Sequence, residues 1–546
     1  MGWTKWIRRA RVEPLLFGMM VCLELAPLWS CKCFPSQDGP SHLENSKILL
    51  DYHRQDRPLL REYYDLNTEV PTNWLGHLIT AGLLAVLSPT TAEKVFVSGY
   101  LILFPLAVRY AAKGVKPDAA WASWFAFPFL YSHWLHMGFY NFSYGFAFFF
   151  LLVGYYLRHR LAFGVRQWAV ASALGLVLFA WHPVSLVLAG LTVGISGAGL
   201  AYAEWARDRG RSGWSRGLWP SIKSVSPALS AFAPAALLLM LFVRTTQEQD
   251  PGTPETLSMR LGKLILVKLP SFHNAEVWLL LALSAGLIGL SAFAAGKAVR
   301  QKKLDGGVCF LAVAAICAAM VLVLPRRMAG GDYFVARVAF FVYFALILWL
   351  AGRDLALPLR RCAQATAAGI AIVLAVLYAS TYRQLDPYLD EFLSVSAHVK
   401  RDSTVLPICF ARSGGHVEPR LRRTIETFLH AVGHVAIARN AIVLDNFEAA
   451  SRAFPILYSR KMDPRAHIGT AELGFRHGAG PKLDILGYKK RTGGEVDYVL
   501  LWGLETAEKD NPAVRAVLDQ LREGYEMVYK SSPHGLAQLY QRKPMR

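Results

Sequence analysis

Residues 338–361 read VAFFVYFALILWLAGRDLALPLRR, an apolar run that ends in a cluster of arginines. The same unit recurs along the chain. About eleven apolar stretches lie between Pro14 and Tyr382, and nearly every second gap between them is rich in Lys and Arg. With 54% hydrophobic and 18% charged residues, the composition lies outside the range of soluble globular proteins. The sequence therefore predicts a polytopic α-helical membrane bundle.

Each apolar stretch is expected to form one helix of roughly 20 residues. The predicted spans are 14–29, 93–112, 117–135, 139–157, 166–182, 183–205, 226–244, 277–296, 306–324, 338–352 and 363–381. We interpret the first as a retained span, because no small-x-small cleavage site follows it. Asn73–Ser88 is short for a span, and we expect it to lie on or partly in the outer leaflet. Ser41–Arg61 has the pattern of an amphipathic helix at the membrane surface.

The basic gaps predict which loops share a side of the membrane. They are Lys5–Arg11, Arg109–Lys116, Arg158–Arg166, Arg207–Lys223, Lys297–Lys303 and Arg353–Arg361. Loops of this kind stay cytoplasmic, so the chain is expected to be integral to the cytoplasmic membrane with its N-terminus inside. The segments expected outside are 30–92, 133–140, 182, 244–276, 325–337 and everything after 382. This topology and anionic lipid head groups account for the formal charge of +20, so nucleic acid is not an expected partner.

Residues 383–546 have the pattern of a soluble α/β domain outside the membrane, whereas 1–382, with the outer loop 30–92, form the transmembrane domain. Strands are predicted at 404–410, 435–444, 497–502 and 536–540, and helices at 418–431 and 513–523. Asp445 and Asn446 follow a predicted strand, a usual position for a binding residue. Acceptor recognition is one interpretation of them, and an ordinary turn is the other.

The stretch QDGPSHLENS (37–46) carries the strongest candidate for catalysis. One interpretation is structural: Asp-Gly-Pro forms a tight turn and Ser41 caps the helix that follows. The other places Asp38 at the membrane surface facing a cavity, where partial desolvation raises its basicity and suits it to remove a proton from an acceptor hydroxyl. His42 would then be the neighbour of the base.

The architecture and four short motifs resemble the GT-C superfamily of integral-membrane glycosyltransferases. A first span with basic residues inside leads to a long outer loop that opens with an acid, then to surface helices, paired spans and a terminal outer domain. The motifs are PTNWLGHL (71–78), AEKV (92–95), LPRR (324–327) and GGDYFVAR (330–337). Two departures are clear. Gly39 stands where relatives often have a second acid, and HWLHMGFYNFS (133–143) has His133, His136 and Asn141 where many carry an acid.

The resemblance implies transfer of a sugar from a polyprenyl-phosphate carrier to an acceptor, as in mannosyltransferases and aminoarabinose transferases, with the bilayer as a further partner. In that superfamily the first acid serves as base or helps to hold a metal, so Asp38 is the expected base and a divalent cation is a possible cofactor. The late outer loop brings Arg or Tyr to the carrier phosphate, which points to Arg326, Arg327, Tyr333 and Arg337.

The three arginines are also unusual without the resemblance, because they place cations on the outer side. A guanidinium pair at the lipid boundary suits bidentate contact with phosphate, and the alternative is that the side chains snorkel to head groups. Polar residues in or next to spans are further cavity candidates; these are Glu24, His77, His133, Asn141 and His182. No metal ligands are assigned: His133 and His136 could join His42 or His77 in a metal site, but no HxxxH or CxxC pattern supports one.

Two other classes of protein remain open. A transporter would carry polar residues or Gly and Pro breaks near the midplane of paired spans, whereas the polar residues here gather at the outer boundary. A non-enzymatic envelope protein would leave the outer cavity without convergent polar groups.

Overall fold

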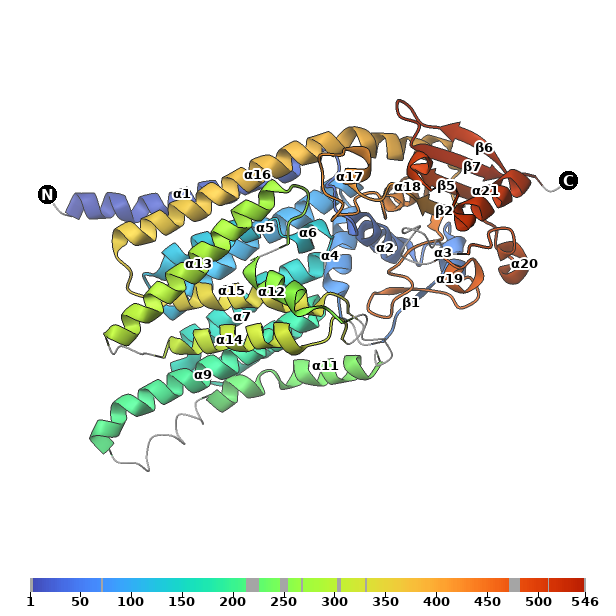
Figure 1. The fold of residues 1–546 in the computed structure, drawn as a ribbon. Helices are drawn as coiled ribbons and strands as arrows, with labels where there is room; N and C mark the ends of the chain where they lie inside the picture. The colour runs from blue at the N-terminus through green and yellow to red at the C-terminus, as the bar shows by residue number, and fades with distance from the viewer. Residues whose placement is uncertain are drawn as a thin grey trace.

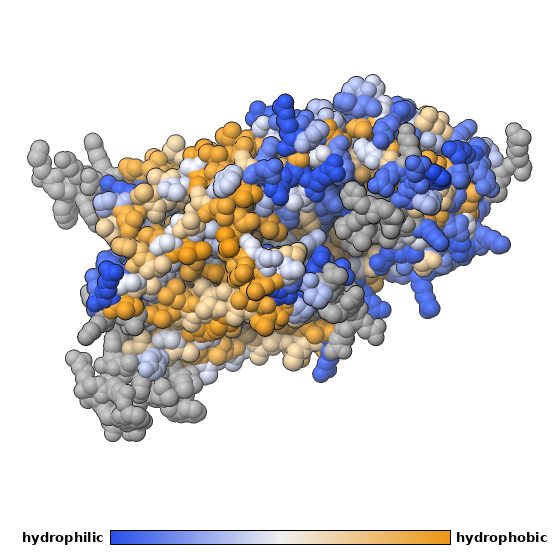
Figure 2. Space-filling view, viewed as in Figure 1, coloured by the Kyte–Doolittle hydropathy of each residue, from blue (hydrophilic) through white to orange (hydrophobic). Residues whose placement is uncertain are grey.

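The structure is a computed structural model that describes residues 3–69, 72–212, 225–245, 254–266, 269–301, 306–328, 331–470, 482–508 and 510–544. The molecule is elongated: a bundle of helices forms one end, a small α/β region forms the other, and the two termini lie at opposite ends (Figure 1). On the face that Figure 2 shows, apolar side chains dominate the surface of the bundle, whereas polar ones dominate the α/β region. An apolar surface of this extent is expected where lipid replaces water.

Within the described residues, six helices are long and apolar enough to cross a bilayer. They are α1 (Trp3–Trp29), α5 (Pro89–Val115), α9 (Pro183–Ser212), α13 (Ala275–Arg300), α15 (Phe334–Ala351) and α16 (Leu357–Leu393). Other helices of the bundle are α4 (Trp74–Leu84), α7 (Tyr140–His159), α8 (Val165–Trp181), α11 (Ala233–Thr245), α12 (Leu257–Ile265) and α14 (Val308–Val323). The chain is therefore a helical, multi-pass membrane protein.

The prediction of a regular spanning helix at 117–135 is wrong. This stretch forms a 3-10 helix, η1 (Ala119–Phe129), followed by the single turn α6 (His133–His136). A 3-10 helix rises about 2.0 Å per residue instead of about 1.5 Å, so η1 covers more distance with fewer residues. Pro128, near its end, has no N–H to continue a helical ladder. Each of the other predicted spans coincides with helical residues.

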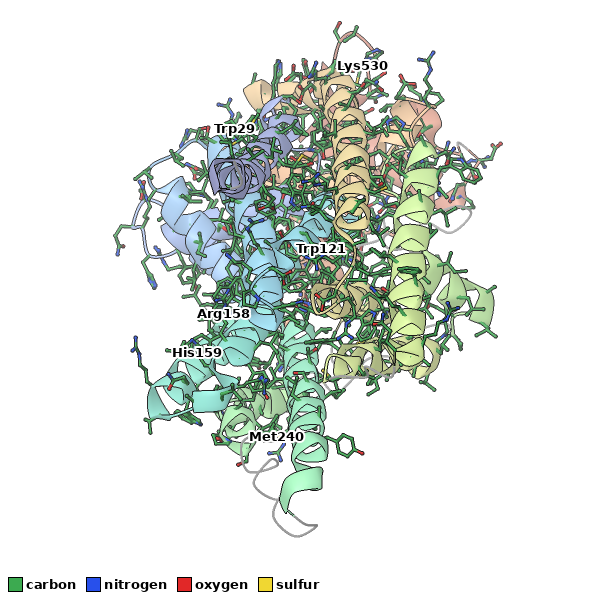
Figure 3. All side chains as sticks on the ribbon, turned by 90° about the vertical axis from the view of Figure 1, so that its left-hand side faces the viewer. Trp29, Trp121, Arg158, His159, Met240 and Lys530 are labelled. Atoms are coloured by element: carbon green, nitrogen blue, oxygen red, sulfur yellow. The ribbon has the colours of Figure 1, made fainter. Side chains whose placement is uncertain are left out.

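The ends of several helices that carry basic residues gather at the end of the bundle that Figure 3 views. Arg109 near the end of α5 donates to Glu13 of α1 at 2.8 Å. Arg360 of α16 donates to Asp118 at 2.9 Å. Arg109 and Arg360 belong to two of the predicted cytoplasmic gaps, and both lie at the end opposite the α/β region. Residues 213–223 and 302–303 of the other gaps lie outside the described residues.

The α/β region is built on a mixed sheet of five strands in the order β3-β2-β5-β7-β6. The strands are β2 (Thr404–Cys409), β3 (Ile442–Val443), β5 (Tyr498–Trp502), β6 (Tyr525–Lys530) and β7 (Ala537–Arg542). β2 is parallel to β3 and β5, and β7 is antiparallel to β5 and β6. A separate antiparallel pair joins β1 (Tyr64–Leu66) of the outer loop to β4 (Ile456–Tyr458). The outer loop is thus part of the α/β region.

The predicted strands at 404–410, 497–502 and 536–540 are confirmed, and the predicted helix at 513–523 is α21 (Pro512–Gly524). Two predictions are wrong. The first half of 435–444 belongs to helix α18 (Val432–Arg439), which ends where Asn440 adopts a left-handed conformation with φ of 57°, and only Ile442–Val443 form a strand, β3. Residues 418–431 form no regular helix, because their backbone bonds elsewhere: Arg422 N–H donates to the Phe272 carbonyl at 2.7 Å.

The outer loop does not form the predicted surface helix. Helix α2 (Gly39–Asp51) is buried along most of its length between α4 and α18, and α3 (Pro58–Tyr63) follows it. Glu44 and Asp51, which are acidic residues of this helix, are only 4% and 3% exposed. The charge of Asp51 is compensated by Arg57, whose Nη1 lies 3.0 Å from Asp51 Oδ2. Hydropathy alone cannot reveal this burial, because α2 is covered by protein from distant parts of the chain.

Helix α16 connects the bundle to the sheet without interruption. Its 37 residues extend over about 55 Å, more than a bilayer core requires. The predicted domain division after Tyr382 lies within this helix. At its far end Glu391 accepts hydrogen bonds from Ser531 Oγ at 2.7 Å and from Leu536 N–H at 3.0 Å. The end of α16 is therefore anchored to the sheet.

Candidate functional site

A cavity of about 1770 Å³ lies where the bundle meets the α/β region. Its apolar wall comes mainly from α9, α11 and α14, and includes Leu188, Phe242 and Met320. Its polar wall comes from the start of α2, the start of α15 and the segment after β3. The residues of the sequence prediction that line it are Asp38, His42, His133, Asn141, His182, Arg327, Tyr333 and Arg337. Glu24, His77 and Arg326 are not among the lining residues.

Asp38 is held at the start of α2 by the backbone. Its N–H donates to the Met137 carbonyl at 3.2 Å, and its carbonyl accepts from His42 N–H at 3.0 Å. Asp38, rather than Ser41, is the N-cap residue, yet its carboxylate makes no capping bond. The close approach needs Gly138, whose φ is +83° and whose absent Cβ would lie 2.8 Å from Asp38 N. The turn therefore directs the carboxylate to other partners.

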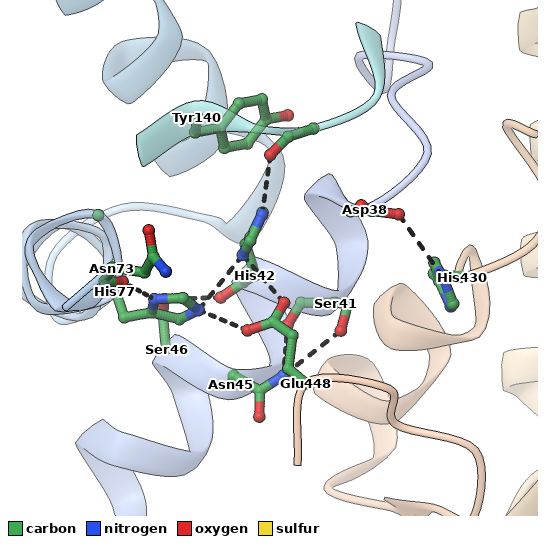
Figure 4. A network of polar contacts seen from close by, with 12 residues as sticks. Asp38, Ser41, His42, Asn45, Ser46, Asn73, His77, Tyr140, His430 and Glu448 are labelled. Carbon is green, nitrogen blue, oxygen red and sulfur yellow. Dashed lines mark hydrogen bonds and ion pairs between the residues drawn. The ribbon is translucent and has the colours of Figure 1, made fainter. Parts of the chain in front are cut away.

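Two side chains next to the Asp38 carboxylate are neutral. Gln37 Nε2 donates to Asp38 Oδ1 at 3.1 Å, and His430 Nε2 lies 3.6 Å from the same oxygen (Figure 4). Burial lowers the pKa of His430 to about 3, because the charged imidazolium is disfavoured away from water. The contact between Asp38 and His430 is therefore one between a carboxylate and a neutral imidazole at physiological pH.

His42, His77 and Glu448 form a compact buried group beside Asp38 (Figure 4). His42 Nδ1 lies 2.9 Å from Glu448 Oε1, and His77 Nε2 lies 2.6 Å from Glu448 Oε2. The two ring nitrogens are 3.3 Å apart. The members come from α2, α4 and the segment after β3, so only the folded chain brings them together. Of the three, only His42 also lines the cavity.

The charges of this group are coupled. Burial opposes ionisation of Glu448, but His42 and His77 outweigh it, so the pKa of Glu448 is well below its usual range. Burial likewise opposes protonation of His42, and Glu448 outweighs it, so the pKa of His42 is raised. Burial and the nearby Glu448 raise the pKa of Glu44 to about 8. Glu448 is therefore the carboxylate that stays ionised, and Glu44 is mainly protonated at neutral pH.

Arg337, near the start of α15, also lines the cavity. Its Nη1 donates to His182 Nε2 at 2.8 Å, and its guanidinium lies 4.8 Å from the ring centre of Phe139 and 5.3 Å from that of Phe142. Such ring faces stabilise a cation without neutralising it. In the described part of the chain, no carboxylate lies within ion-pair distance of this guanidinium. Arg337 therefore presents a net positive charge to the cavity.

The two other arginines of the prediction have a carboxylate partner. Arg326 Nε lies 2.9 Å from Asp332 Oδ1, and Arg327 Nε lies 3.4 Å from Asp332 Oδ2. Tyr333, next in the chain, adopts a left-handed conformation with φ of 60° and begins α15. Arg327 and Tyr333 line the cavity, whereas Arg326 packs over the Tyr333 ring at 5.4 Å.

The remaining candidates divide by position. Asn141 is a structural link, because its Oδ1 accepts from Gly76 N–H at 2.9 Å and its Nδ2 donates to the Asn73 carbonyl at 3.0 Å. Glu24 is buried within α1 and away from the cavity. His136 lies between Ser271 and Tyr382, with contacts of 2.8 Å and 2.6 Å.

Sequence reasoning did not assign roles to Glu448, His430 and Arg412, which lie in or beside this site. The signal for Glu448 was its position shortly after a strand, the same signal that pointed to Asp445 and Asn446. His430 stands in an HxxxH pattern with His434, but the position of His430 and Arg412 beside the site depends on neighbours far away in the sequence. No protein-family model matches this chain, and a search of curated proteins found no match.

Proposed function

We propose that the protein is a membrane glycosyltransferase that transfers a sugar from a polyprenyl-phosphate carrier to an acceptor hydroxyl on the extracytoplasmic face. The observation that carries the proposal is the position of Asp38 and Arg337 on the wall of one cavity. A buried carboxylate on a cavity wall suits a general base. A guanidinium that has no carboxylate at ion-pair distance among the described residues suits a phosphate. The apolar wall from α9, α11 and α14 offers a surface for the prenyl chain.

In the proposed reaction Asp38 takes the proton of the acceptor hydroxyl while the oxygen of that hydroxyl forms a bond to the anomeric carbon. The bond from that carbon to the phosphate oxygen breaks, and the polyprenyl phosphate leaves with the electron pair. Arg337 stabilises the negative charge on the departing phosphate. Direct displacement of this kind inverts the anomeric centre. His42, at the edge of the cavity, holds the start of α2 through its contact of 2.8 Å with the Gly138 carbonyl.

The proposal includes the topology of about eleven spans with the N-terminus inside. Its support is that basic ends of α5 and α16 lie together at the end of the bundle opposite the cavity. The cavity would then open on the extracytoplasmic side, where the acceptor is met.

Asp38→Asn tests the catalytic role. The amide keeps the shape of the side chain but cannot accept the proton, so transfer should fall by about 10²- to 10⁴-fold. The measurement is transfer of radiolabelled sugar from a native lipid extract in membranes that carry each variant. Asp56→Asn is the matched control, because Asp56 belongs to the same outer loop and its side chain is 65% exposed.

Glu44 and Asp51 are unsuitable controls, since both are buried. Wild-type transfer together with full activity of Asp38→Asn would show that the base lies elsewhere. Absence of transfer by the wild type across polyprenyl-phosphate sugars would favour a protein that binds without catalysis.

A further inference from the structure

We infer that His42, His77 and Glu448 form a binding site for a divalent transition-metal ion of the zinc class, which joins the α/β region to α2 and α4. The inference does not depend on the proposed glycosyl transfer. Asp38, the acid of the sequence motif, does not belong to this group, so the site differs from a metal held by that motif. The three donor atoms lie within 4.8 Å of one another.

The hydrogen bonds of the two imidazoles leave the correct nitrogens for a metal. His42 Nε2 lies 2.8 Å from the Gly138 carbonyl oxygen, and His77 Nδ1 lies 3.1 Å from the Asn73 carbonyl oxygen. A carbonyl only accepts, so each of these nitrogens carries the proton. In a neutral imidazole the other nitrogen then has a lone pair. Metal-bound histidines have this arrangement, with the second nitrogen donating to a carbonyl or carboxylate.

Three electron-rich groups consequently converge on one point. The lone-pair nitrogens His42 Nδ1 and His77 Nε2 face each other at 3.3 Å, and each faces an oxygen of Glu448. A positive charge between them, either a metal ion or protons on the imidazoles, offsets their mutual repulsion. Ligands at about 2.0–2.2 Å from a tetrahedral zinc lie roughly 3.3 Å apart, so small adjustments of the side chains would admit the ion.

The chemistry of the donors selects the class of metal. Imidazole nitrogen with one carboxylate oxygen suits zinc and its neighbours in the first transition row, whereas calcium and magnesium prefer oxygen alone. Two His and one Glu leave one position open for water or another ligand. His42 lines the cavity, which gives the ion a route to the buried group.

The segment that carries Glu448 is held against α2 by contacts that need no metal. Asn45 Nδ2 donates to Asn446 Oδ1 at 3.1 Å, and Asn446 Nδ2 donates to Asn45 Oδ1 at 3.1 Å. Gly433 of α18 allows a close approach, since a Cβ there would lie 2.4 Å from the Pro40 carbonyl oxygen. The donor set is thus positioned in advance, and Glu448→Gln should fold.

The metal content of the purified full-length chain tests the inference. The protein is expressed with ZnCl₂, purified in detergent and dialysed. Its zinc content per chain is then measured by elemental mass spectrometry. We expect one zinc ion per chain in the wild type, and at least about tenfold less in Glu448→Gln and His77→Gln. His434→Gln is the matched control, because His434 is also a buried histidine near α2 but lies outside the group.

A second measurement does not rely on the variants. Titration of metal-free wild type with CoCl₂ should produce a visible absorption band that saturates at one equivalent and disappears when zinc is added. The inference is overturned if the wild type holds no more zinc than Glu448→Gln, or if stoichiometric cobalt produces no band. Either result would mean that protons on the histidines, rather than a metal, neutralise Glu448.

Discussion

Arg337 shows how one side chain can hold a charge ready for a ligand. A cation in a poorly hydrated wall is costly unless something compensates it. Here the compensation comes from the rings of Phe139 and Phe142 and from the neutral acceptor His182 Nε2. These groups stabilise the guanidinium and leave its charge intact. Its neighbours Arg326 and Arg327 differ, because Asp332 neutralises part of their charge.

We predict that Arg337→Ala abolishes sugar transfer while the protein still inserts and folds. Arg337→Lys should recover only part of the activity, because an ammonium group cannot make bidentate contact with a phosphate. Both variants are assayed for transfer in membranes, and folding is followed by size-exclusion chromatography in detergent. Arg54→Ala, at an exposed ion pair, is the control. If the activity of Arg337→Ala stayed within a few fold of wild type, Arg337 would not be the residue that binds the carrier phosphate.

His434 gives a prediction about pH. Burial lowers its pKa to about 4, whereas an imidazole in the unfolded chain titrates near 6.5. Between these values the unfolded state binds more protons, so stability rises with pH and is lost on acidification. At pH 5 the loss should be on the order of 2 kcal/mol.

The check is thermal unfolding of wild type and His434→Gln from pH 5 to pH 7. The glutamine cannot take up a proton, so the unfolding temperature of the variant should fall less on acidification. Equal falls in the two proteins would show that His434 does not titrate in this way.

At the scale of elements, two helices next to the cavity begin at residues in the left-handed conformation. Asn73 precedes α4 with φ of 58°, and Tyr333 precedes α15 with φ of 60°. Residues other than Gly rarely adopt this backbone conformation, and it is costly for them. At Asn73 the conformation aims the carbonyl at His77 Nδ1 and Asn141 Nδ2, at 3.1 Å and 3.0 Å. The start of α4 therefore fixes the orientation of His77.

We predict that Asn73→Gly leaves stability nearly unchanged, whereas Asn73→Val lowers it by about 1–3 kcal/mol. Glycine adopts a positive φ readily, but a β-branched residue does not. Thermal unfolding in detergent measures the difference, with Asn73→Gly as the matched control. If valine were tolerated as well as glycine, the left-handed start of α4 would not be a constraint on the fold.

At the scale of the whole molecule, the arrangement of charge predicts an orientation. The N-terminus and the basic ends of helices lie at the end of the bundle opposite the α/β region (Figure 1). Because basic loops remain cytoplasmic, a periplasmic-type reporter fused after residue 546 should be active, and a cytoplasmic reporter there should be silent. A reporter in the loop at 213–223 should give the reverse result. A cytoplasmic signal from the C-terminal fusion would contradict the orientation.

The sequence by itself determined the parts of this protein that depend on local hydropathy. Apolar runs predict helices such as α13 and α15 wherever lipid or protein surrounds them, because the backbone has no water to bond with. Strands β2 and β5 were also predicted correctly, since short apolar runs rich in β-branched and aromatic residues have no competing local structure. The candidates Asp38 and Arg337 followed from unusual charges beside apolar runs.

Only the tertiary structure decided which distant residues meet. The run 435–444 suits a strand or a buried helix equally. The packing of α18 against α2 accompanies a helix up to Arg439, and only Ile442–Val443 form a strand. The sequence suggests that Glu44 is solvated, but in the folded protein α4 and α18 cover the helix that carries it. His77 and Glu448 are separated by 371 positions, so no local pattern relates them. Such contacts form only when buried surface from the whole chain offsets the entropy lost in bringing the segments together.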